Sequence, residues 1–207
     1  IELDLKNNQK NFLLFMIPKK KEDNDFNFNF QKNVISTIKN RFKSDILLWA
    51  DVCLCSMTTH GHCCLFDSKK NIDLNKSLST LSNIALNYSE AGIDGIAPSD
   101  MMDGRTASIR KILDNNEYNL MPIMSYSTKF ASNFYGPFRY AADSTPSFGD
   151  RKQYQLDYRN KSEAIRASVR CFKEGADFLM VKPGQGSIDL IEKIKIKTGL
   201  MVGAYQV

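Results

Sequence analysis

Six short apolar segments recur along the chain, and each has the length of a β-strand. They lack a regular alternation of polar and apolar residues, as expected for parallel strands that are covered on both faces. Helical patterns lie between them, so the sequence alternates strand and helix. This alternation predicts an α/β fold with a parallel sheet. The six segments are residues 12–17, 46–50, 93–97, 120–124, 178–181 and 200–204.

Three of the intervening helices have clear apolar stripes. One stripe runs from Leu78 to Tyr88 and ends before a glycine, and a second stripe contains Ile165 and Phe172. A third helix is expected directly after Ser187, because serine is a favoured N-cap residue.

Polar and reactive residues follow the ends of four of the strand segments. Six strand–helix units fit either an open doubly wound sheet or most of an eight-stranded barrel. No glycine-rich phosphate turn follows any segment, whereas a barrel gathers its chemistry beyond the C-terminal ends of several strands. We therefore predict a single (β/α)8 TIM-barrel domain over residues 1–207, incomplete, with about six of its eight strands. The residues at the strand ends are Asp51, Cys53, Ser99, Lys129 and Lys182.

The composition excludes several classes of function. The net charge of +5 comes from lysines and arginines scattered among carboxylates, which argues against a nucleic-acid partner. No apolar run approaches the roughly 20 residues that span a bilayer, and we expect no leader sequence. Four of the five cysteines lie within residues 53–64, a pattern typical of metal binding rather than of disulfides. We expect a soluble, cytoplasmic protein with reduced thiols.

The cysteine-rich stretch is the most informative part of the sequence. Cys53, Cys55 and Cys63 could converge on one tetrahedral zinc ion and leave the fourth position open for water or substrate, as in catalytic sites. The alternative is that they are merely buried cysteines, because the spacing matches no common zinc-finger pattern. Competing ligands are Cys64, His60 and His62.

Two lysines are candidates for chemistry on a ketone, and two arginines are candidates for binding a carboxylate. Lys182 ends an apolar strand, and burial there would lower the pKa of its amine and leave part of it neutral for attack on a ketone. Lys129 would lower that pKa further if it shared the pocket, although an ion-paired lysine at a strand end is the simpler interpretation. Arg139 and Arg151 can pair with a carboxylate, and they lie in a long segment, residues 125–160, that has the length of a lid. Surface arginines are the alternative.

These stretches resemble the porphobilinogen synthase (5-aminolevulinate dehydratase) family of the zinc–cysteine type. The resemblance begins at about Asp45 and runs to the last residue, whereas residues 1–44 match loosely. It is carried by Asp-Val-Cys-Leu-Cys at 51–55, Thr-His-Gly-His-Cys at 59–63, and the stretches 97–105, 124–132, 134–139, 149–155, 180–183 and 203–207.

The resemblance implies a lyase that condenses two molecules of 5-aminolevulinate to porphobilinogen in heme biosynthesis. It implies Schiff bases on Lys129 and Lys182 and a catalytic Zn²⁺ on Cys53, Cys55 and Cys63. Cys64 stands where the family generally has glycine. The residues that it assigns to the substrates are Arg139, Arg151, Gln155, Tyr135, Ser99 and Asp51, with Arg151 and Gln155 on the lid.

The resemblance also implies a homo-octamer. At several points, however, the chain differs from the family pattern. Ala167 replaces a glutamate that holds an allosteric Mg²⁺ in many bacterial members, so we expect no such site. The chain starts at Ile1 without methionine and stops at Val207, so we expect both ends to be cut. The N-terminal arm, the first strand, the C-terminal strand, and a serine and tyrosine that bind the first substrate would then be missing.

Two other functions are compatible with parts of this pattern. A class I Schiff-base aldolase needs one lysine and no cysteine-bound metal, so the cysteine-rich stretch speaks against it. An inactive relic or fragment would keep zinc binding without turnover.

Overall fold

The computed structural model describes all 207 residues, and six strands form its centre. They form two three-stranded sheets in which every pair of neighbours is parallel and the strand order follows the sequence. An isolated parallel bridge between Ile96 and Ile123 joins the two sheets. The strands are β1 (Asn11–Leu14), β2 (Leu47–Val52), β3 (Gly95–Pro98), β4 (Met124–Lys129), β5 (Phe178–Lys182) and β6 (Met201–Ala204).

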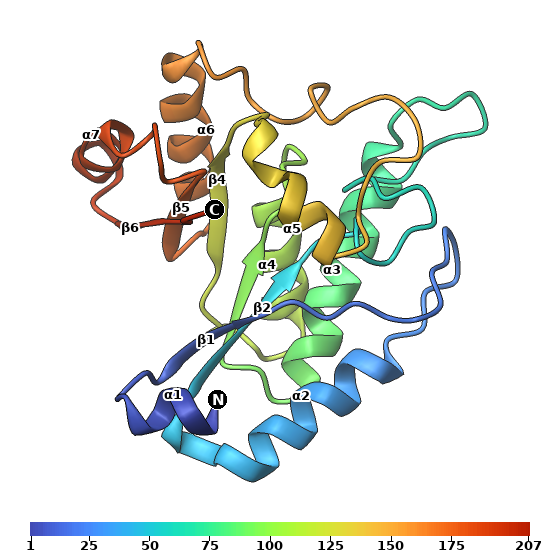
Figure 1. The fold of residues 1–207 in the computed structure, drawn as a ribbon, viewed down its shortest axis with the longest axis vertical. Coiled ribbons are helices and arrows are strands. Elements are labelled where there is room, and N and C mark those ends of the chain that lie inside the picture. Colours follow the sequence, from blue (N-terminus) through green and yellow to red (C-terminus); the bar gives the residue numbers. More distant parts are fainter.

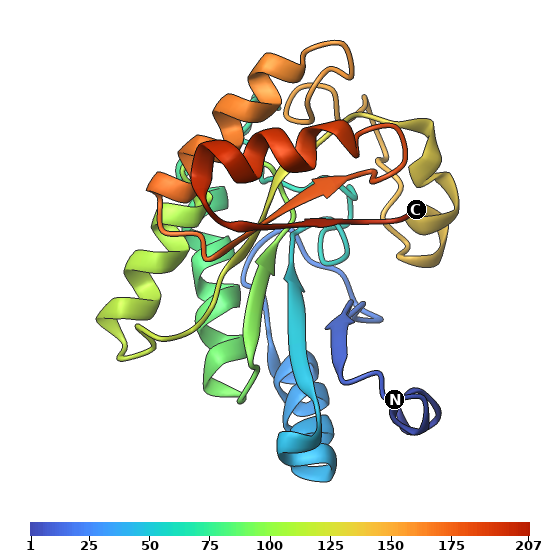
Figure 2. The same ribbon diagram turned by 90° about the vertical axis from the view of Figure 1, so that its left-hand side faces the viewer.

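A helix lies between each pair of consecutive strands, which confirms the predicted α/β alternation (Figure 1). Helices α6 and α7 pack on the sheet of β4, β5 and β6, and α3 packs on α4 (Figure 2). The helices are α1 (Glu2–Lys6), α2 (Asn29–Phe42), α3 (Leu74–Glu90), α4 (Arg105–Asn115), α5 (Gly136–Ala141), α6 (Lys161–Lys173) and α7 (Asp189–Thr198), with 3₁₀ turns at Lys43–Asp45 and Asn133–Tyr135.

Two apolar cores hold the helices against the strands. The larger contains 20 buried residues and joins β2 to α2, α3 and α4, with Leu48, Leu81 and Ile109 among its members. The smaller contains 10 buried residues and packs β5 against α6 and α7. Both cores lie between the strands and the helices that pack on them.

The fourth strand lies further along the chain than its apolar segment predicts. Leu120 is 91% exposed, and the strand begins at Met124 and continues through serines and a threonine to Lys129. Their hydroxyl groups are buried because they form hydrogen bonds with α4 and α6. Hydropathy therefore missed a strand whose outer face is polar but fully paired.

Two helix predictions need correction. Helix α6 buries Ala164, Ala167, Ser168 and Cys171, whereas Phe172 is 40% exposed, because small side chains let the helix approach β4 closely. Ser187 does not cap α7: Ile188 occupies the N-cap position and no side chain caps the helix.

The strands do not close into a barrel in this chain. The outer edges of β1 and β6 pair with no other strand. The parallel order is confirmed, and the closed (β/α)8 barrel is not seen. None of the helices has both the length and the apolar character needed to cross a bilayer.

Candidate active site

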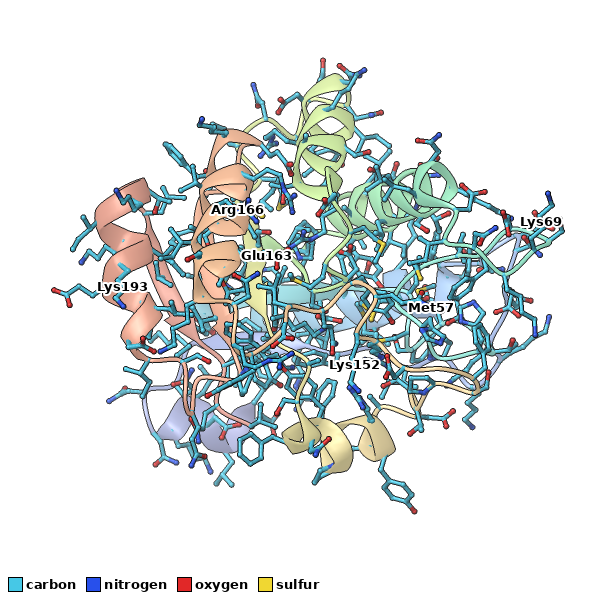
Figure 3. All side chains as sticks on the ribbon, turned by 90° about the horizontal axis from the view of Figure 1, so that it is seen from above. Met57, Lys69, Lys152, Glu163, Arg166 and Lys193 are labelled. Atoms are coloured by element: carbon cyan, nitrogen blue, oxygen red, sulfur yellow. The ribbon has the colours of Figure 1, made fainter.

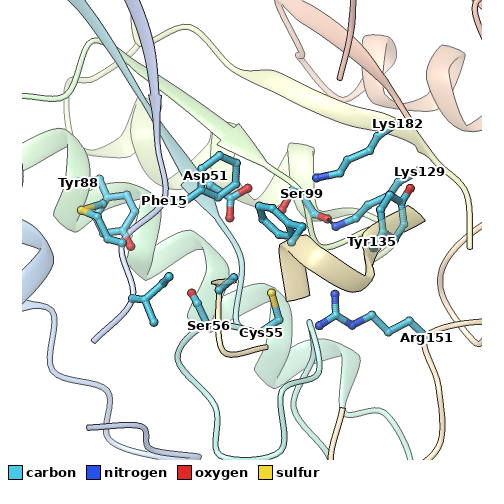
Figure 4. A pocket seen from close by; sticks show the side chains of 14 residues that line it. Phe15, Asp51, Cys55, Ser56, Tyr88, Ser99, Lys129, Tyr135, Arg151 and Lys182 are labelled. Carbon is cyan, nitrogen blue, oxygen red and sulfur yellow. Dashed lines mark hydrogen bonds between the residues drawn. The ribbon is translucent and has the colours of Figure 1, made fainter. Parts of the chain in front are cut away.

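A pocket lies where the C-terminal ends of β2, β3, β4 and β5 meet, and segments far apart in the sequence line it (Figure 4). Seven of the eleven predicted site residues line this pocket. The lining residues are Phe15, Met16, Ile17, Asp51, Cys55, Ser56, Tyr88, Ser99, Lys129, Tyr135, Phe138, Ala142, Arg151 and Lys182.

The two predicted lysines lie side by side in this pocket. Lys129 and Lys182 are register partners on β4 and β5, and both side chains are almost fully buried. The Nζ atom of Lys129 donates a hydrogen bond of 2.5 Å to the carbonyl oxygen of Ser99. The Nζ atom of Lys182 lies 3.6 Å from the ring centre of Tyr205 and 4.4 Å from that of Phe138. Neighbouring parallel strands thus bring two amines to one wall of the pocket.

The surroundings of Lys182 favour its neutral form. Burial, with the positive charge of Lys129 second, lowers the pKa of Lys182 to about 7, against the opposing effect of Asp51. Asp51 faces the lysines from β2 (Figure 4), and one of its carboxylate oxygens is buried without a hydrogen-bond partner. Burial raises the pKa of this carboxyl group, and a hydrogen bond with Ser99 and the two lysines oppose the shift. The pocket can therefore supply an uncharged amine near neutral pH.

Three cysteines form a buried cluster beside the pocket. The sulfur atoms of Cys53, Cys55 and Cys63 lie within 4.8 Å of one another, and the Sγ atoms of Cys53 and Cys55 are 3.3 Å apart. Hydrogen bonds from Cys53 and Cys55 lower the pKa of Cys63, so one thiolate is already favoured in the cluster. Cys53 and Cys55 leave the end of β2, and the loop that follows returns Cys63 to them.

The competing ligands lie elsewhere. Cys64 belongs to the larger apolar core, where burial raises the pKa of its thiol to about 12. Both ring nitrogens of His62 are engaged, Nδ1 with the Tyr154 hydroxyl at 3.0 Å and Nε2 with the Phe148 carbonyl at 2.8 Å. His62 therefore supports the loop from outside the cluster, and the same Tyr154 hydroxyl accepts a hydrogen bond from the Cys63 amide.

The cluster could hold a metal ion that prefers soft ligands. Three thiol sulfurs converge in a buried place, and soft thiolate ligands select zinc over hard cations. Cys55 also lines the pocket, so a metal ion held here would lie next to the lysines. Three ligands leave one position open, as in catalytic zinc sites.

The long segment before α6 supplies part of the pocket lining, including Tyr135, Phe138 and Arg151. In Figure 3 the loop that carries Lys152 runs between α6, marked by Glu163 and Arg166, and the loop marked by Met57. Arg151 lines the pocket and donates hydrogen bonds to the carbonyl oxygens of Gly61, at 2.9 Å, and Ser144.

A second pocket next to the first collects the remaining predicted polar residues. Arg139, Arg151 and Gln155 line it together, so Arg151 borders both pockets. Both atoms of the Gln155 side-chain amide are buried without a partner, which leaves them free for a ligand. The hydroxyl group of Tyr135 is already used, since it donates to the Phe130 carbonyl oxygen at 2.8 Å.

The sequence reasoning missed aromatic residues around the lysines. Phe15 follows β1, Phe138 belongs to α5, and Tyr126 lies on β4 with its ring centre 5.7 Å from Lys182 Nζ. The position of Phe15 after a strand, like that of Asp51, was a usable signal.

A buried ion pair outside the pocket lining was also missed. Arg105 Nε lies 3.5 Å from Asp100 Oδ2, and both side chains are almost fully buried. Burial raises the pKa of Asp100 to about 6, although the charge of Arg105 opposes the shift.

The chain is similar in sequence to known proteins of one family. The family model described as delta-aminolevulinic acid dehydratase matches residues 2–207. The delta-aminolevulinic acid dehydratase of Helicobacter pylori is 45% identical over 202 residues, which are 96% of this chain and 62% of that protein. The Staphylococcus aureus enzyme of the same name is 45% identical over 199 residues, covering 94% of this chain and 62% of its own length.

A solved structure has a similar fold. It is the Toxoplasma gondii delta-aminolevulinic acid dehydratase (porphobilinogen synthase) in complex with the reaction product porphobilinogen, with a TM-score of 0.82 and 39% identity. The match covers 90% of this chain and 52% of that chain. The present chain therefore spans about 62% of the length of the curated relatives that it matches. On this evidence, the chain belongs to the delta-aminolevulinic acid dehydratase family.

Proposed function

We propose that the protein is a porphobilinogen synthase, a hydro-lyase of heme biosynthesis that condenses two 5-aminolevulinate molecules to porphobilinogen and releases two waters. The observation that carries the proposal is the pairing of Lys129 and Lys182 in one buried pocket beside a three-cysteine cluster. Neither feature alone is specific, but together they fit imine formation on two ketones next to a metal ion.

Lys182 is the first nucleophile in this proposal. Its neutral amine attacks the ketone carbon of one substrate, and the ketone oxygen leaves as water when the imine forms. The rings of Tyr205 and Phe138 lie against the amine and exclude water that would hydrolyse the imine.

Lys129 forms the corresponding imine with the second substrate. Its hydrogen bond to the Ser99 carbonyl oxygen fixes the position of the Nζ atom on the wall that it shares with Lys182. Each protonated imine makes the adjacent carbon more acidic, and the Asp51 carboxylate faces the lysines as a candidate base.

Cys53, Cys55 and Cys63 would hold Zn²⁺, which supplies Lewis-acid activation of an amine or ketone oxygen of the second substrate. Arg139, Arg151 and Gln155 would bind the carboxylate of that substrate, since they share one pocket and Arg151 also lines the pocket of the lysines. Tyr135, Ser99 and Asp51 line the reaction pocket and position the substrates. The segment that carries Arg151 acts as a lid.

Three wider features belong to the same proposal. The six parallel strands form most of a (β/α)8 barrel, and the whole protein assembles as a homo-octamer in the cytoplasm. All five cysteines are free, which fits a reducing compartment. Ala167 is buried on α6 and carries no metal ligand, so the lack of an allosteric Mg²⁺ stays a prediction.

Borohydride trapping tests the proposal. The longest natural form of the protein is loaded with zinc, incubated with 5-aminolevulinate, reduced with borohydride and mapped by mass spectrometry. We expect reduced adducts on Lys182 and Lys129 and formation of porphobilinogen without borohydride. Lys193→Met is the matched control, because Lys193 is an exposed lysine on α7 that does not line the pocket.

The outcomes separate the alternatives. An adduct on one lysine with no dependence on zinc would favour a class I aldolase. Zinc binding to a folded protein with no adduct at all would identify an inactive relic and refute the proposal.

A further inference from the structure

Strand β4 contains a β-bulge directly before Lys129. Ser125 pairs with Leu179 of β5, and Thr128 pairs with Val181. Between these two pairs β4 advances by three residues, whereas β5 advances by two. Bulges are rare in parallel sheets, and they re-aim the side chains that follow them.

The side chains of β4 show what the extra residue does. Ser125 points outward, where its Oγ atom lies 3.1 Å from Thr106 Oγ1 on α4, and Tyr126 points inward toward Lys182. Ser127 and Thr128 both point outward to α6. Regular alternation would place Thr128 inside and Lys129 outside, so the bulge is the reason that Lys129 enters the pocket.

A buried cluster of three hydroxyl groups holds the two consecutive outward residues. Ser168 Oγ on α6 lies 2.9 Å from Ser127 Oγ and 3.0 Å from Thr128 Oγ1. Thr128 also donates to the Ala164 carbonyl oxygen at 3.3 Å, and Ser168 donates to the same oxygen at 2.9 Å. All three hydroxyl-bearing residues are fully buried, so an unpaired hydroxyl here would be costly.

A second contact fixes the strand before the bulge. Arg105 Nη2 donates to the Tyr126 carbonyl oxygen at 2.9 Å and to Ser125 Oγ at 3.2 Å. The bulged segment is thus held from α4 on one side and from α6 on the other. Its conformation depends on side chains that never touch the pocket.

We propose that Ser168 and Thr128 are positioning residues, whose hydroxyl groups stabilise the bulge and thereby aim Lys129 into the pocket beside Lys182. The inference rests on the proposed imine chemistry of Lys129 for its effect on turnover. The geometric part, the direction of Lys129, can be tested separately.

The test compares Thr128→Val and Ser168→Ala, which remove one hydroxyl group each, with Thr128→Ser, which keeps it. The control is Ser82→Ala, because Ser82 and Ser108 form a hydroxyl pair of 2.7 Å between α3 and α4, away from the pocket. Each variant is examined by thermal unfolding, by borohydride trapping with 5-aminolevulinate on both lysines, and by crystal structure.

We expect Thr128→Val and Ser168→Ala to lose the Lys129 adduct while the Lys182 adduct persists. Turnover should fall by roughly 100-fold, as is seen when a reacting group moves by about 1 Å. Thr128→Ser should restore both adducts, and Ser82→Ala should keep both despite a similar loss of thermal stability. A merely structural role of the cluster would instead lower the two adducts together.

Two results would overturn the inference. One is an unchanged ratio of Lys129 adduct to Lys182 adduct in both Thr128→Val and Ser168→Ala. The other is a crystal structure of either variant in which Lys129 still reaches the Ser99 carbonyl oxygen. If the unmodified protein forms no adduct, the proposed function fails, and the crystal structures alone decide whether the hydroxyl groups aim Lys129.

Discussion

The pKa of Lys182 can be tested through the pH dependence of imine formation. The amine attacks a ketone only when it is neutral, and burial together with the charge of Lys129 lowers its pKa from 10.5 to about 7. At pH 7 about half of the Lys182 amines are then neutral, against roughly three in ten thousand for an unperturbed lysine. The pocket therefore increases the reactive fraction by roughly a thousandfold.

The direction of the pH dependence follows from the positive charge of the protonated Lys182 amine, which cannot attack a ketone. As the pH falls through 7, Lys182 gains a proton and the rate of adduct formation falls, whereas above pH 8 the rate reaches a plateau. Replacing Lys129 by methionine removes the second-largest cause of the shift. The midpoint should move upward but stay below 10.5, because burial remains.

The assay is the initial rate of borohydride trapping on Lys182 between pH 5 and pH 9, measured by peptide mapping. Lys193→Met removes an exposed lysine on α7 and should leave the midpoint near 7. A wild-type midpoint close to that of a free lysine would refute the argument from burial. An unchanged midpoint in Lys129→Met would refute the argument from charge.

Three further predictions concern the metal, the lid and the core. Cys63→Ala should abolish zinc binding in metal analysis, whereas Cys64→Ala should keep the zinc, because Cys64 lies outside the cluster. Arg151→Met should raise KM for 5-aminolevulinate by about 10- to 100-fold, the effect of losing charge-assisted hydrogen bonds, while the exposed Arg166→Met should not. Leu48→Ala should lower the free energy of unfolding by about 2–5 kcal/mol in a denaturant titration, because Leu48 is fully buried in the larger core.

The main features of the pocket could be predicted from the sequence because parallel strands impose a simple rule. Their C-terminal ends meet at one edge, so residues such as Asp51, Ser99 and Lys182 that follow apolar segments had to lie close together. The three cysteines could be predicted as a cluster because their loop starts at the end of a strand. In each case a local pattern determined a long-range contact.

The parts that could not be predicted depend on side-chain pairing across elements. The outer face of β4 is polar, and only the hydrogen bonds of Ser125 and Thr128 to the helices allow it to be buried. The face of α6 that packs against the sheet consists of small residues such as Ala164 and Ser168, which give only a weak hydrophobic signal in the sequence. A helix stripe read from large apolar residues therefore included Phe172, which is 40% exposed, although its member Ile165 packs against the smaller core.

The wrong predictions for β4 and α6 have one physical origin, which is the burial of hydroxyl groups between this strand and this helix. The same hydroxyl groups affect the position of Lys129. Small residues on α6 bring the helix backbone close enough for Thr128 to reach the Ala164 carbonyl oxygen, and Ser168 supplies the partner that a bulged strand needs. An apolar β4 with regular alternation would be easier to recognise in a sequence, but its last residue would face α6. The hydroxyl groups of β4, rather than apolar packing, thus determine the position of the bulge, where the inward and outward alternation of side chains is interrupted. A polar β4 can therefore direct Lys129 toward Lys182.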